Sequence, residues 1–234
     1  MSVLATLPPR PWFYHYANPF LRWLFWLTTR VDIRGLENVP QKGGLIIAIS
    51  HSSFLDPALL AAFTPRPDVV PMTKAEAFNI PILGFLLRLY GAFPVRRGQA
   101  DVSAFKMALT ILNSQAVMII APEGHRSETG VLQKGREGAI LLSLRSGAPI
   151  LPVGVWGGKK YWSSLMRFRR APVHCRIGKP VLPVANSKPT RADLERMSDE
   201  LMLKIAELMP RELHGYYADA LDQPINYLQM YQAR

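Results

Sequence analysis

The sequence lacks the cysteines that a disulfide framework or a thiolate metal site would need. Cys175 is the single cysteine among 234 residues, so no disulfide can form within the chain and a Cys/His zinc site would have no set of thiolates. Such cysteine usage is typical of a reducing, intracellular compartment. We therefore expect no disulfide and no metal site.

Long apolar runs are missing as well. Residues 8–11 contain three prolines and an arginine, which does not match a cleaved secretory signal. Residues 18–30 are rich in Trp, Phe and Leu but are interrupted by Arg22, and they open with an Asn-Pro pair that is typical of a helix start. About a dozen residues at ~1.5 Å each cover roughly half of a ~30 Å hydrocarbon core. This helix cannot cross a bilayer alone, but it could lie in the membrane interface or pack on the protein.

Acidic residues are scarce compared with basic ones. Twenty-eight Lys and Arg against seventeen Asp and Glu give a net charge of +11, which favours nucleic acid, anionic lipid or phosphorylated small molecules as partners. No acidic residue precedes Asp32, whereas Arg10, Arg22 and Arg30 flank the N-terminal aromatic residues. Because this is the composition of an interfacial anchor, we predict an amphipathic membrane-surface helix in residues 1–30 and the main domain in residues 31–234.

A second basic segment covers residues 159–176. It contains six Lys or Arg, no acidic residue, and the aromatic residues Tyr161, Trp162 and Phe168. Each basic residue near an anionic surface contributes ~1 kcal/mol, so this segment could help to hold the protein at a membrane. Binding of RNA by stacking and charge is the main alternative for this segment.

The remaining chain alternates short apolar runs with helical patterns. With 49% apolar residues, the chain can bury the core of one domain. Helices between buried strands imply crossover connections, so we predict an α/β fold with a mostly parallel central sheet flanked by helices, and ligands at the carboxyl ends of the strands. The expected strands are residues 45–49, 69–72, 92–95, 117–121, 150–155 and 173–177, and the expected helices are residues 58–63, 78–89, 102–112, 136–144 and 191–209.

A histidine and an aspartate follow the first of these strands. His51 and Asp56 are five residues apart, and Pro57 follows. On a continuous helix, five residues turn the chain by about 500°, so contact between the two side chains requires a turn before the helix. One interpretation is that Asp56 only caps the helix and His51 is structural. In the other, the carboxylate orients the imidazole, which removes a hydroxyl proton and accelerates a reaction by roughly 10²- to 10⁴-fold.

Three further blocks follow this pair. They are GAFPVRR at residues 91–97, PEGHRS at 122–127 and APILPV at 148–153. Together with HSSFLD at residues 51–56, an H-x-x-x-x-D block, they resemble the glycerolipid acyltransferase family, which includes 1-acyl-sn-glycerol-3-phosphate (lysophosphatidic acid) acyltransferases. Any one block is weak, but four in this order are not expected by chance.

The resemblance implies a reaction. His51 would be the general base and Asp56 its orienting partner. A fatty acyl group would pass directly from acyl-CoA or acyl carrier protein to the free hydroxyl of 1-acyl-sn-glycerol-3-phosphate, giving phosphatidic acid for phospholipid biosynthesis. No acyl-enzyme and no cofactor are expected, and the location implied is the cytoplasmic face of a membrane, peripheral or monotopic.

The resemblance also implies a phosphate site at Lys74, Arg97 and Arg126, since guanidinium and ammonium groups hold a phosphate and position the neighbouring hydroxyl. Glu123 and Gly124 would support this site. We expect Glu123, which follows a central strand, to need a partner, either Arg126, a substrate hydroxyl or a structural ion pair.

Several points leave the acceptor open. His125 stands where family members usually carry a small hydroxyl residue, and Arg96 where an acidic or polar residue is common. Glycerol-3-phosphate, another lysophospholipid or a glycolipid are alternative acceptors, and a basic membrane-binding module without catalysis is a further alternative. A serine hydrolase has little support because the chain has no G-x-S-x-G motif. We expect no nucleic-acid partner.

Overall fold

Within residues 11–96, 101–185 and 187–232, which the computed structural model describes, nine strands form one sheet. The main path has the order β1-β7-β6-β2-β5-β3-β4, and β8 pairs with β6 and β9. The strands are β1 (Thr29–Arg34), β2 (Leu45–Ile49), β3 (Val69–Lys74), β4 (Phe93–Val95), β5 (Val117–Ile120), β6 (Ile150–Trp156), β7 (Ala171–Ile177), β8 (Val181–Pro183) and β9 (Leu228–Met230).

The predicted mostly parallel sheet is confirmed. Strand β2 lies parallel to β5 and β6, β3 lies parallel to β4 and β5, and β1 lies parallel to β7. Only the pairs β6–β7, β6–β8 and β8–β9 are antiparallel among the described strands. The carboxyl ends of β2, β5, β3 and β4 therefore lie along one edge of the sheet, and the segments that follow these strands meet there.

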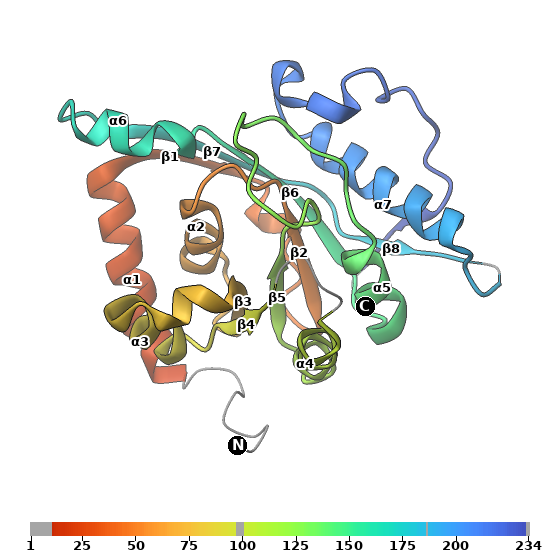
Figure 1. Cartoon of the computed structure of the whole chain (residues 1–234), viewed down its shortest axis with the longest axis horizontal. Helices are drawn as coiled ribbons and strands as arrows, with labels where there is room; N and C mark the ends of the chain where they lie inside the picture. The colour runs from red at the N-terminus through yellow and green to blue at the C-terminus, as the bar shows by residue number, and fades with distance from the viewer. Residues whose placement is uncertain (1–10, 97–100, 186, 233–234) are drawn as a thin grey trace.

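Helices cover both faces of the sheet (Figure 1). Because side chains alternate along a strand, Ile46 and Ala48 of β2 join the core under α4, α5 and α7, whereas Leu45, Ile47 and Ile49 join the core under α1 and α2. The helices are α1 (Pro11–Thr28), α2 (Leu55–Phe63), α3 (Pro81–Leu89), α4 (Val102–Asn113), α5 (Gly138–Ser146), α6 (Tyr161–Leu165) and α7 (Arg191–Ala206).

The N-terminal helix differs from its prediction. It begins at Pro11 and continues through Pro19 rather than starting there. Tyr14, Asn18 and Phe25 are spaced by four and seven residues and are buried, so packing of this stripe on α2 and β3 stabilises the helix despite the backbone hydrogen bond that a proline removes. Strand β1 follows α1 directly, so the boundary predicted at residue 30 falls inside a strand of the sheet.

Candidate active site

The turn between β2 and α2 brings His51 and Asp56 together. Asp56 is the second residue of α2, and its Oδ2 atom lies 3.2 Å from Nδ1 of His51. The turn that the five-residue spacing requires is therefore present. His51 is 7% exposed and Asp56 is fully buried, so the pair is largely shielded from water.

The same carboxylate oxygen also holds the turn. Asp56 Oδ2 accepts the backbone N–H groups of Ser52 at 2.9 Å and Ser53 at 2.7 Å. Burial raises the pKa of Asp56, and the hydrogen bonds from His51, Ser53 and Ser52 oppose that rise. Since Asp56 accepts from Nδ1–H, Nε2 of His51 carries the lone pair, and no described residue hydrogen-bonds to it.

Glu123 follows β5 and supports this turn from the neighbouring strand. Its Oε1 accepts the backbone N–H of His51 at 2.9 Å, and its Oε2 accepts the backbone N–H of Gln133 at 3.0 Å. The expectation that Arg126 or an ion pair satisfies Glu123 is wrong, because these two backbone donors satisfy a carboxylate that is only 1% exposed. Burial raises the pKa of Glu123, opposed by these two hydrogen bonds.

The loop after β5 closes on the β2–α2 turn at a second point. The backbone N–H of Ser127 donates to the carbonyl of His51 at 2.8 Å. Gly124 has φ +80°, a conformation that favours glycine, and a Cβ there would lie 3.1 Å from Nε of Arg136. Gly124 therefore lets this loop turn back toward His51. Residues of this loop, including Gly130, Val131 and Leu132, surround His51 closely and leave no space for a water molecule between them.

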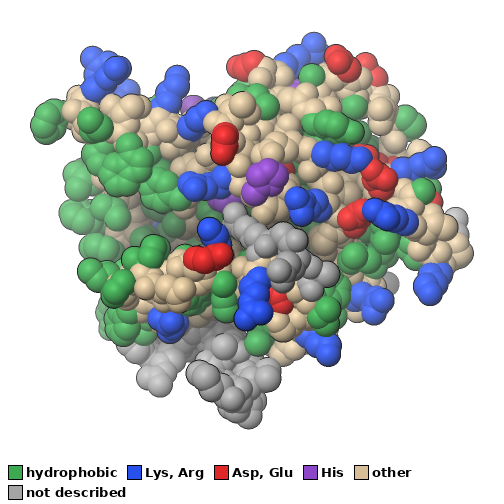
Figure 2. All heavy atoms as spheres, viewed as in Figure 1, with side chains coloured by type: hydrophobic (Ala, Val, Ile, Leu, Met, Phe, Trp, Pro, Cys, Tyr) green, Lys and Arg blue, Asp and Glu red, His purple; other side chains and the backbone are tan. Residues whose placement is uncertain are grey.

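The basic residues predicted at the phosphate site sit at the same edge of the sheet. Lys74 is the last residue of β3, its side chain is 54% exposed, and its ammonium is 3.9 Å from Glu76. Arg126 is exposed and forms no ion pair with a described residue. Arg96 follows β4, next to β3, whereas Arg97 lies outside the described residues. Figure 2 shows Lys and Arg side chains gathered around a histidine near the centre of the view.

One close neighbour of the pair was not predicted from the sequence. Gly158 lies in a short 3-10 turn after β6, and a Cβ there would be 2.8 Å from Cβ of Ser53 and 3.5 Å from Oδ1 of Asp56. That Asp56 oxygen is buried and has no hydrogen-bond partner in the described part of the chain. The Gly157-Gly158 pair directly after a buried strand was the signal in the sequence that could have suggested a close backbone approach.

The side chains described above combine an acid–base pair with nearby cations. Among the described residues, no group of three or more His, Cys, Asp or Glu side chains is placed to hold a metal ion. The arrangement offers a buried imidazole with one oriented nitrogen, a carboxylate beside it, and cations on neighbouring strands. Such a group of residues can remove a proton from a hydroxyl and hold an anion nearby.

Comparison with known proteins places this site in a family. The sequence model of the family described as Acyltransferase matches residues 30–156, which is more than half of the chain and includes His51, Asp56 and Glu123. The chain is 29% identical over 185 residues to the chloroplastic 1-acyl-sn-glycerol-3-phosphate acyltransferase BAT2 of Brassica napus, covering 77% of this chain and 51% of that protein.

Bacterial proteins with the same name are similarly related. The one from Pseudomonas aeruginosa is 29% identical over 168 residues, covering 68% of this chain and 64% of that protein. The one from Bacillus subtilis is 26% identical over 196 residues, covering 83% of this chain and 96% of that protein. The chain thus spans between about half and nearly all of the length of these relatives.

A solved structure shares the fold. The crystal structure of the 1-acyl-sn-glycerophosphate (LPA) acyltransferase PlsC from Thermotoga maritima matches with a TM-score of 0.65 at 23% identity, covering 83% of this chain and 78% of that chain. The predicted α/β architecture is therefore confirmed by a known fold as well as by the described strands.

Proposed function

Given that the chain belongs to the acyltransferase family, we propose that it transfers a fatty acyl group from a thioester to the free hydroxyl of 1-acyl-sn-glycerol-3-phosphate, giving phosphatidic acid in phospholipid biosynthesis. The observation that carries this proposal is the buried His51–Asp56 pair, with Nδ1 and Oδ2 3.2 Å apart, at the edge of the sheet where Lys74 and Arg126 also lie. The names of the relatives described above support this acceptor.

In the proposed reaction, His51 acts as the general base. Nε2 takes the proton of the acceptor hydroxyl as the hydroxyl oxygen attacks the thioester carbonyl carbon. The C–S bond then breaks, and the leaving thiolate receives the proton from the imidazolium. Asp56 holds the ring in the required tautomer and stabilises the imidazolium, an arrangement that contributes roughly 10²- to 10⁴-fold to the rate.

The phosphate of the acceptor would bind Lys74, Arg126 and Arg97. Lys74 is half exposed and Arg126 has no ion pair among the described residues, so both can approach a ligand without breaking a buried interaction. Guanidinium groups bind phosphate through two parallel hydrogen bonds. Fixing the phosphate holds the neighbouring hydroxyl near His51, which makes the attack effectively unimolecular.

We propose that the protein works at the cytoplasmic face of a membrane as a peripheral or monotopic protein. No helix in the described part of the chain is long and apolar enough to span a bilayer. Large apolar side chains are nevertheless exposed on three helices that lie on the same side of the molecule (Figures 1 and 2). They are Phe20, Trp23, Trp26 and Leu27 of α1, Ile82, Phe85 and Leu86 of α3, and Trp162 and Leu165 of α6, followed by Met166 and Phe168.

This apolar surface, which we call the membrane face, is continuous with the catalytic turn. Phe54 lies between His51 and Asp56 in the sequence, is 47% exposed, and stacks on Trp162 with ring centroids 5.9 Å apart. Basic residues border the face, and Arg170 lies 5.4 Å from the ring of Trp26. An acyl chain that leaves the lipid layer would therefore reach His51 along apolar contacts, next to cations that suit anionic headgroups.

The apolar residues of α3 are exposed rather than buried, contrary to the sequence pattern. The sequence pattern of residues 78–87 predicts a buried core helix, with Gly84 leaving room for an acyl chain as an alternative. In the structure Ile82 is 78% exposed, and a Cβ on Gly84 would lie 2.2 Å from the carbonyl oxygen of Phe78. Gly84 therefore lets α3 pack on the preceding 3-10 turn, and the apolar residues face outward.

The first test is thioester consumption. Release of free CoA from an acyl-CoA is measured with and without 1-acyl-sn-glycerol-3-phosphate, for the wild type and His51→Ala, and the assay is repeated with acyl carrier protein as donor. We expect acceptor-dependent release by the wild type with at least one donor and none by the variant. Activity of His51→Ala near the wild-type level would overturn the assignment of the base.

A second arm identifies the acceptor site. Arg126→Ala should raise the KM for 1-acyl-sn-glycerol-3-phosphate and leave the KM for the thioester unchanged. Glycerol-3-phosphate and other lysophospholipids serve as alternative acceptors in the same assay. Preference for one of them would keep the acyltransfer chemistry and change the substrate, whereas an effect of Arg126→Ala on the thioester alone would contradict its role at the phosphate.

A further inference from the structure

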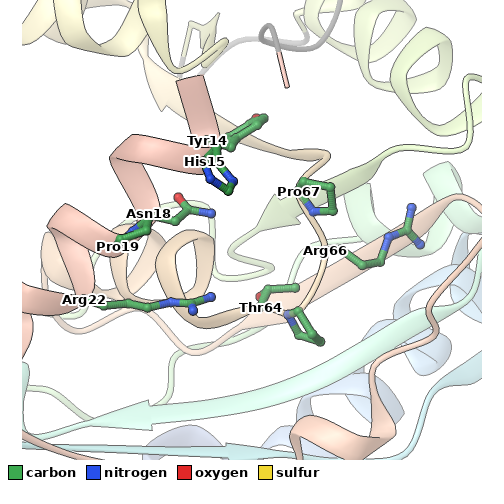
Figure 3. Close-up of a pocket in the computed structure, with 9 residues that line it drawn as sticks. Tyr14, His15, Asn18, Pro19, Arg22, Thr64, Arg66 and Pro67 are labelled. Carbon is green, nitrogen blue, oxygen red and sulfur yellow. The ribbon is translucent and has the colours of Figure 1, made fainter. Parts of the chain in front are cut away.

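An open surface pocket of about 270 Å³, which we call the cavity, lies between α1 and the loop that precedes β3 (Figure 3). Tyr14 of α1 fixes its position, because the Tyr14 hydroxyl donates to the carbonyl of Val69, the first residue of β3, at 2.6 Å. The cavity therefore sits at the amino end of β3, whereas Lys74 and the catalytic turn are at the carboxyl edge. It is separate from the proposed active site.

The cavity contains a buried amide with an unused donor. Asn18 is 8% exposed, and its Oδ1 accepts the hydroxyl of Tyr90 at 2.8 Å. This contact orients the amide so that Nδ2 points into the cavity (Figure 3), where no described residue accepts from it. Nδ2 is open to water rather than fully buried, since it is not among the buried unpaired atoms of the described residues. A ligand acceptor that replaced this water would meet a donor that the Tyr90 contact already orients.

A cation and a hydroxyl lie beside this amide. Arg22, four residues after Asn18 on the same face of α1, donates from Nε to the carbonyl of Ala62 at 2.6 Å. Its two terminal nitrogens have no hydrogen-bond partner in the described part of the chain. Thr64 is 3% exposed and also lines the cavity. The imidazole of His15 lies at the opening (Figure 3).

The lining offers donors and no carboxylate. Arg66 contributes its aliphatic part, since its guanidinium points away in Figure 3 and is bound to Asp68, with Nε 3.0 Å from Oδ1. Further hydrogen bonds to the carbonyls of Gly43 and Gln115 occupy the same guanidinium. Arg22 therefore leaves the cavity with an unbalanced positive charge, directed at the same space as the Asn18 amide.

We infer that this cavity binds a phosphate group. A guanidinium with two free nitrogens matches two phosphate oxygens, and the amide of Asn18 and the hydroxyl of Thr64 can donate to the others. At about 270 Å³, the cavity is smaller than the ~300–1,000 Å³ of sites for drug-sized ligands. It suits a headgroup phosphate or a free phosphate rather than a nucleotide or a whole lipid.

The position of Arg22 on α1 identifies the headgroup of an anionic phospholipid as the source. The residues Phe20, Trp23 and Leu27 are exposed and belong to the membrane face, whereas Tyr14, Asn18 and Phe25 are packed on the protein. Arg22 lies at the border of these two stripes, one turn before the exposed Trp26. Trp side chains sit at the headgroup level of a bilayer, so Arg22 and the cavity would be at that depth. This assignment of the source rests on the proposed membrane location, whereas the phosphate site itself does not.

Three variants with the same net charge test the site. Asn18→Asp keeps an oxygen for the Tyr90 hydroxyl but turns a carboxylate oxygen into the cavity, and Arg22→Gln removes the cation. Arg30→Gln is the control, because Arg30 is an exposed residue at the start of β1 that does not line the cavity. All are made in the full chain carrying Arg126→Ala, so that phosphate binding at the active site contributes as little as possible.

Two measurements distinguish the sources of phosphate. In the first, inorganic phosphate is titrated and the rise in Tm is recorded; we expect a rise for Arg30→Gln and little or none for Asn18→Asp and Arg22→Gln. In the second, binding to phosphatidylcholine vesicles with and without phosphatidylglycerol is compared. The preference for anionic vesicles should fall about fivefold or more for Asn18→Asp and Arg22→Gln relative to Arg30→Gln, beyond the ~1 kcal/mol that any surface charge contributes.

The two measurements together decide whether the site exists and which source of phosphate it binds. A site-specific loss in both measurements supports a headgroup site, and a loss in the first alone supports a phosphate site that takes free phosphate and overturns the lipid source. Equal behaviour of all three variants in both measurements overturns the site. The same three substitutions are also made without Arg126→Ala, and acyltransfer is assayed in detergent. The rate should stay near the wild-type level. A failure of the proposed reaction would therefore appear in this assay and not in the phosphate-binding measurement.

Discussion

Glu123 holds His51 through the backbone: its carboxylate, in the loop after β5, accepts the N–H of His51, in the turn after β2, at 2.9 Å. The second carboxylate oxygen accepts the N–H of Gln133. One buried side chain thus joins the segments after two neighbouring strands and the loop that surrounds His51. The imidazole position depends on this link, because the same turn places His51 beside Asp56.

Glu123→Gln tests the link. A glutamine side chain has one acceptor oxygen, so either His51 N–H or Gln133 N–H would lose its acceptor and face an NH₂ group. Leaving one buried donor unsatisfied costs about 1–3 kcal/mol. We expect denaturant unfolding to show that loss, and kcat to fall about tenfold or more because His51 is less well placed. Glu128→Gln is the control, since Glu128 is exposed, and both quantities should stay near the wild type.

The wild type and Glu123→Gln should also differ in how their stability depends on pH. Burial raises the pKa of Glu123, so the folded protein binds this proton more tightly than the unfolded chain. The stability that this group contributes is present below the unfolded pKa of about 4.3 and is lost as pH rises through the raised folded pKa. The free energy of unfolding of the wild type minus that of Glu123→Gln should therefore decrease from acidic toward neutral pH. A difference that grows with pH would show that the hydrogen bonds outweigh burial.

Asp56→Asn tests the role of the carboxylate beside His51. The side chain keeps its shape and its amide oxygen can still accept the N–H groups of Ser52 and Ser53, but a neutral amide cannot stabilise an imidazolium. We expect kcat to fall by about 10²- to 10⁴-fold with little change in Tm. If the two residues act as a unit, adding His51→Ala to Asp56→Asn should cause little further loss. If the loss in kcat of the double variant were instead the product of the two single losses, the two residues would act independently.

Gly158→Ala tests the close contact between the 3-10 turn after β6 and the turn that holds His51 and Asp56. The added Cβ would lie 2.8 Å from Cβ of Ser53 and 3.5 Å from Oδ1 of Asp56, so the catalytic turn or the 3-10 turn must shift. We expect a loss of about 1–3 kcal/mol in stability and a fall in kcat of about tenfold to 100-fold. Gly138→Ala is the control: nothing lies within 4 Å of its Cβ, and since Gly138 is the first residue of α5, the change should leave kcat unaltered and stability equal to or slightly above that of the wild type. Equal kcat values for the two variants would argue against a positioning role for Gly158.

The residues of the site show where sequence patterns are informative. Strand β2 matches its prediction, because its residues 45–49 are buried on both faces and form a continuous apolar run. Strands β1, β8 and β9 were not predicted, since they depend on pairing with distant strands. The partners of Glu123 and the approach of Gly158 were missed for the same reason: backbone N–H groups and a missing Cβ carry no pattern along the sequence. The apolar pattern of α3 predicts a buried face, and only the fold shows that this face is exposed.

The membrane face gives the last prediction. Phe20, Trp23 and Leu27 of α1 are 59%, 53% and 50% exposed, so serine at all three positions removes apolar area without opening the core. Full burial of such a side chain contributes about 1.5–3 kcal/mol; at half exposure, roughly 1 kcal/mol each remains for the membrane. The triple variant should therefore bind vesicles roughly 100-fold more weakly. Its Tm should fall by several degrees and no more, since only the packed half of each side chain contributes to the fold.

The control replaces exposed apolar residues that lie outside the membrane face. Val102 of α4 and Met230 of β9 are 62% and 54% exposed, and their replacement by serine should leave vesicle binding unchanged, because neither belongs to the membrane face. The thioester assay in detergent separates binding from chemistry: with dissolved substrate, the triple variant should retain its kcat, whereas on vesicles its rate should fall with the bound fraction. If both sets of serine variants bound vesicles like the wild type, α1 would act only as a packing helix, and the basic residues near α6 would have to hold the protein at the membrane without it.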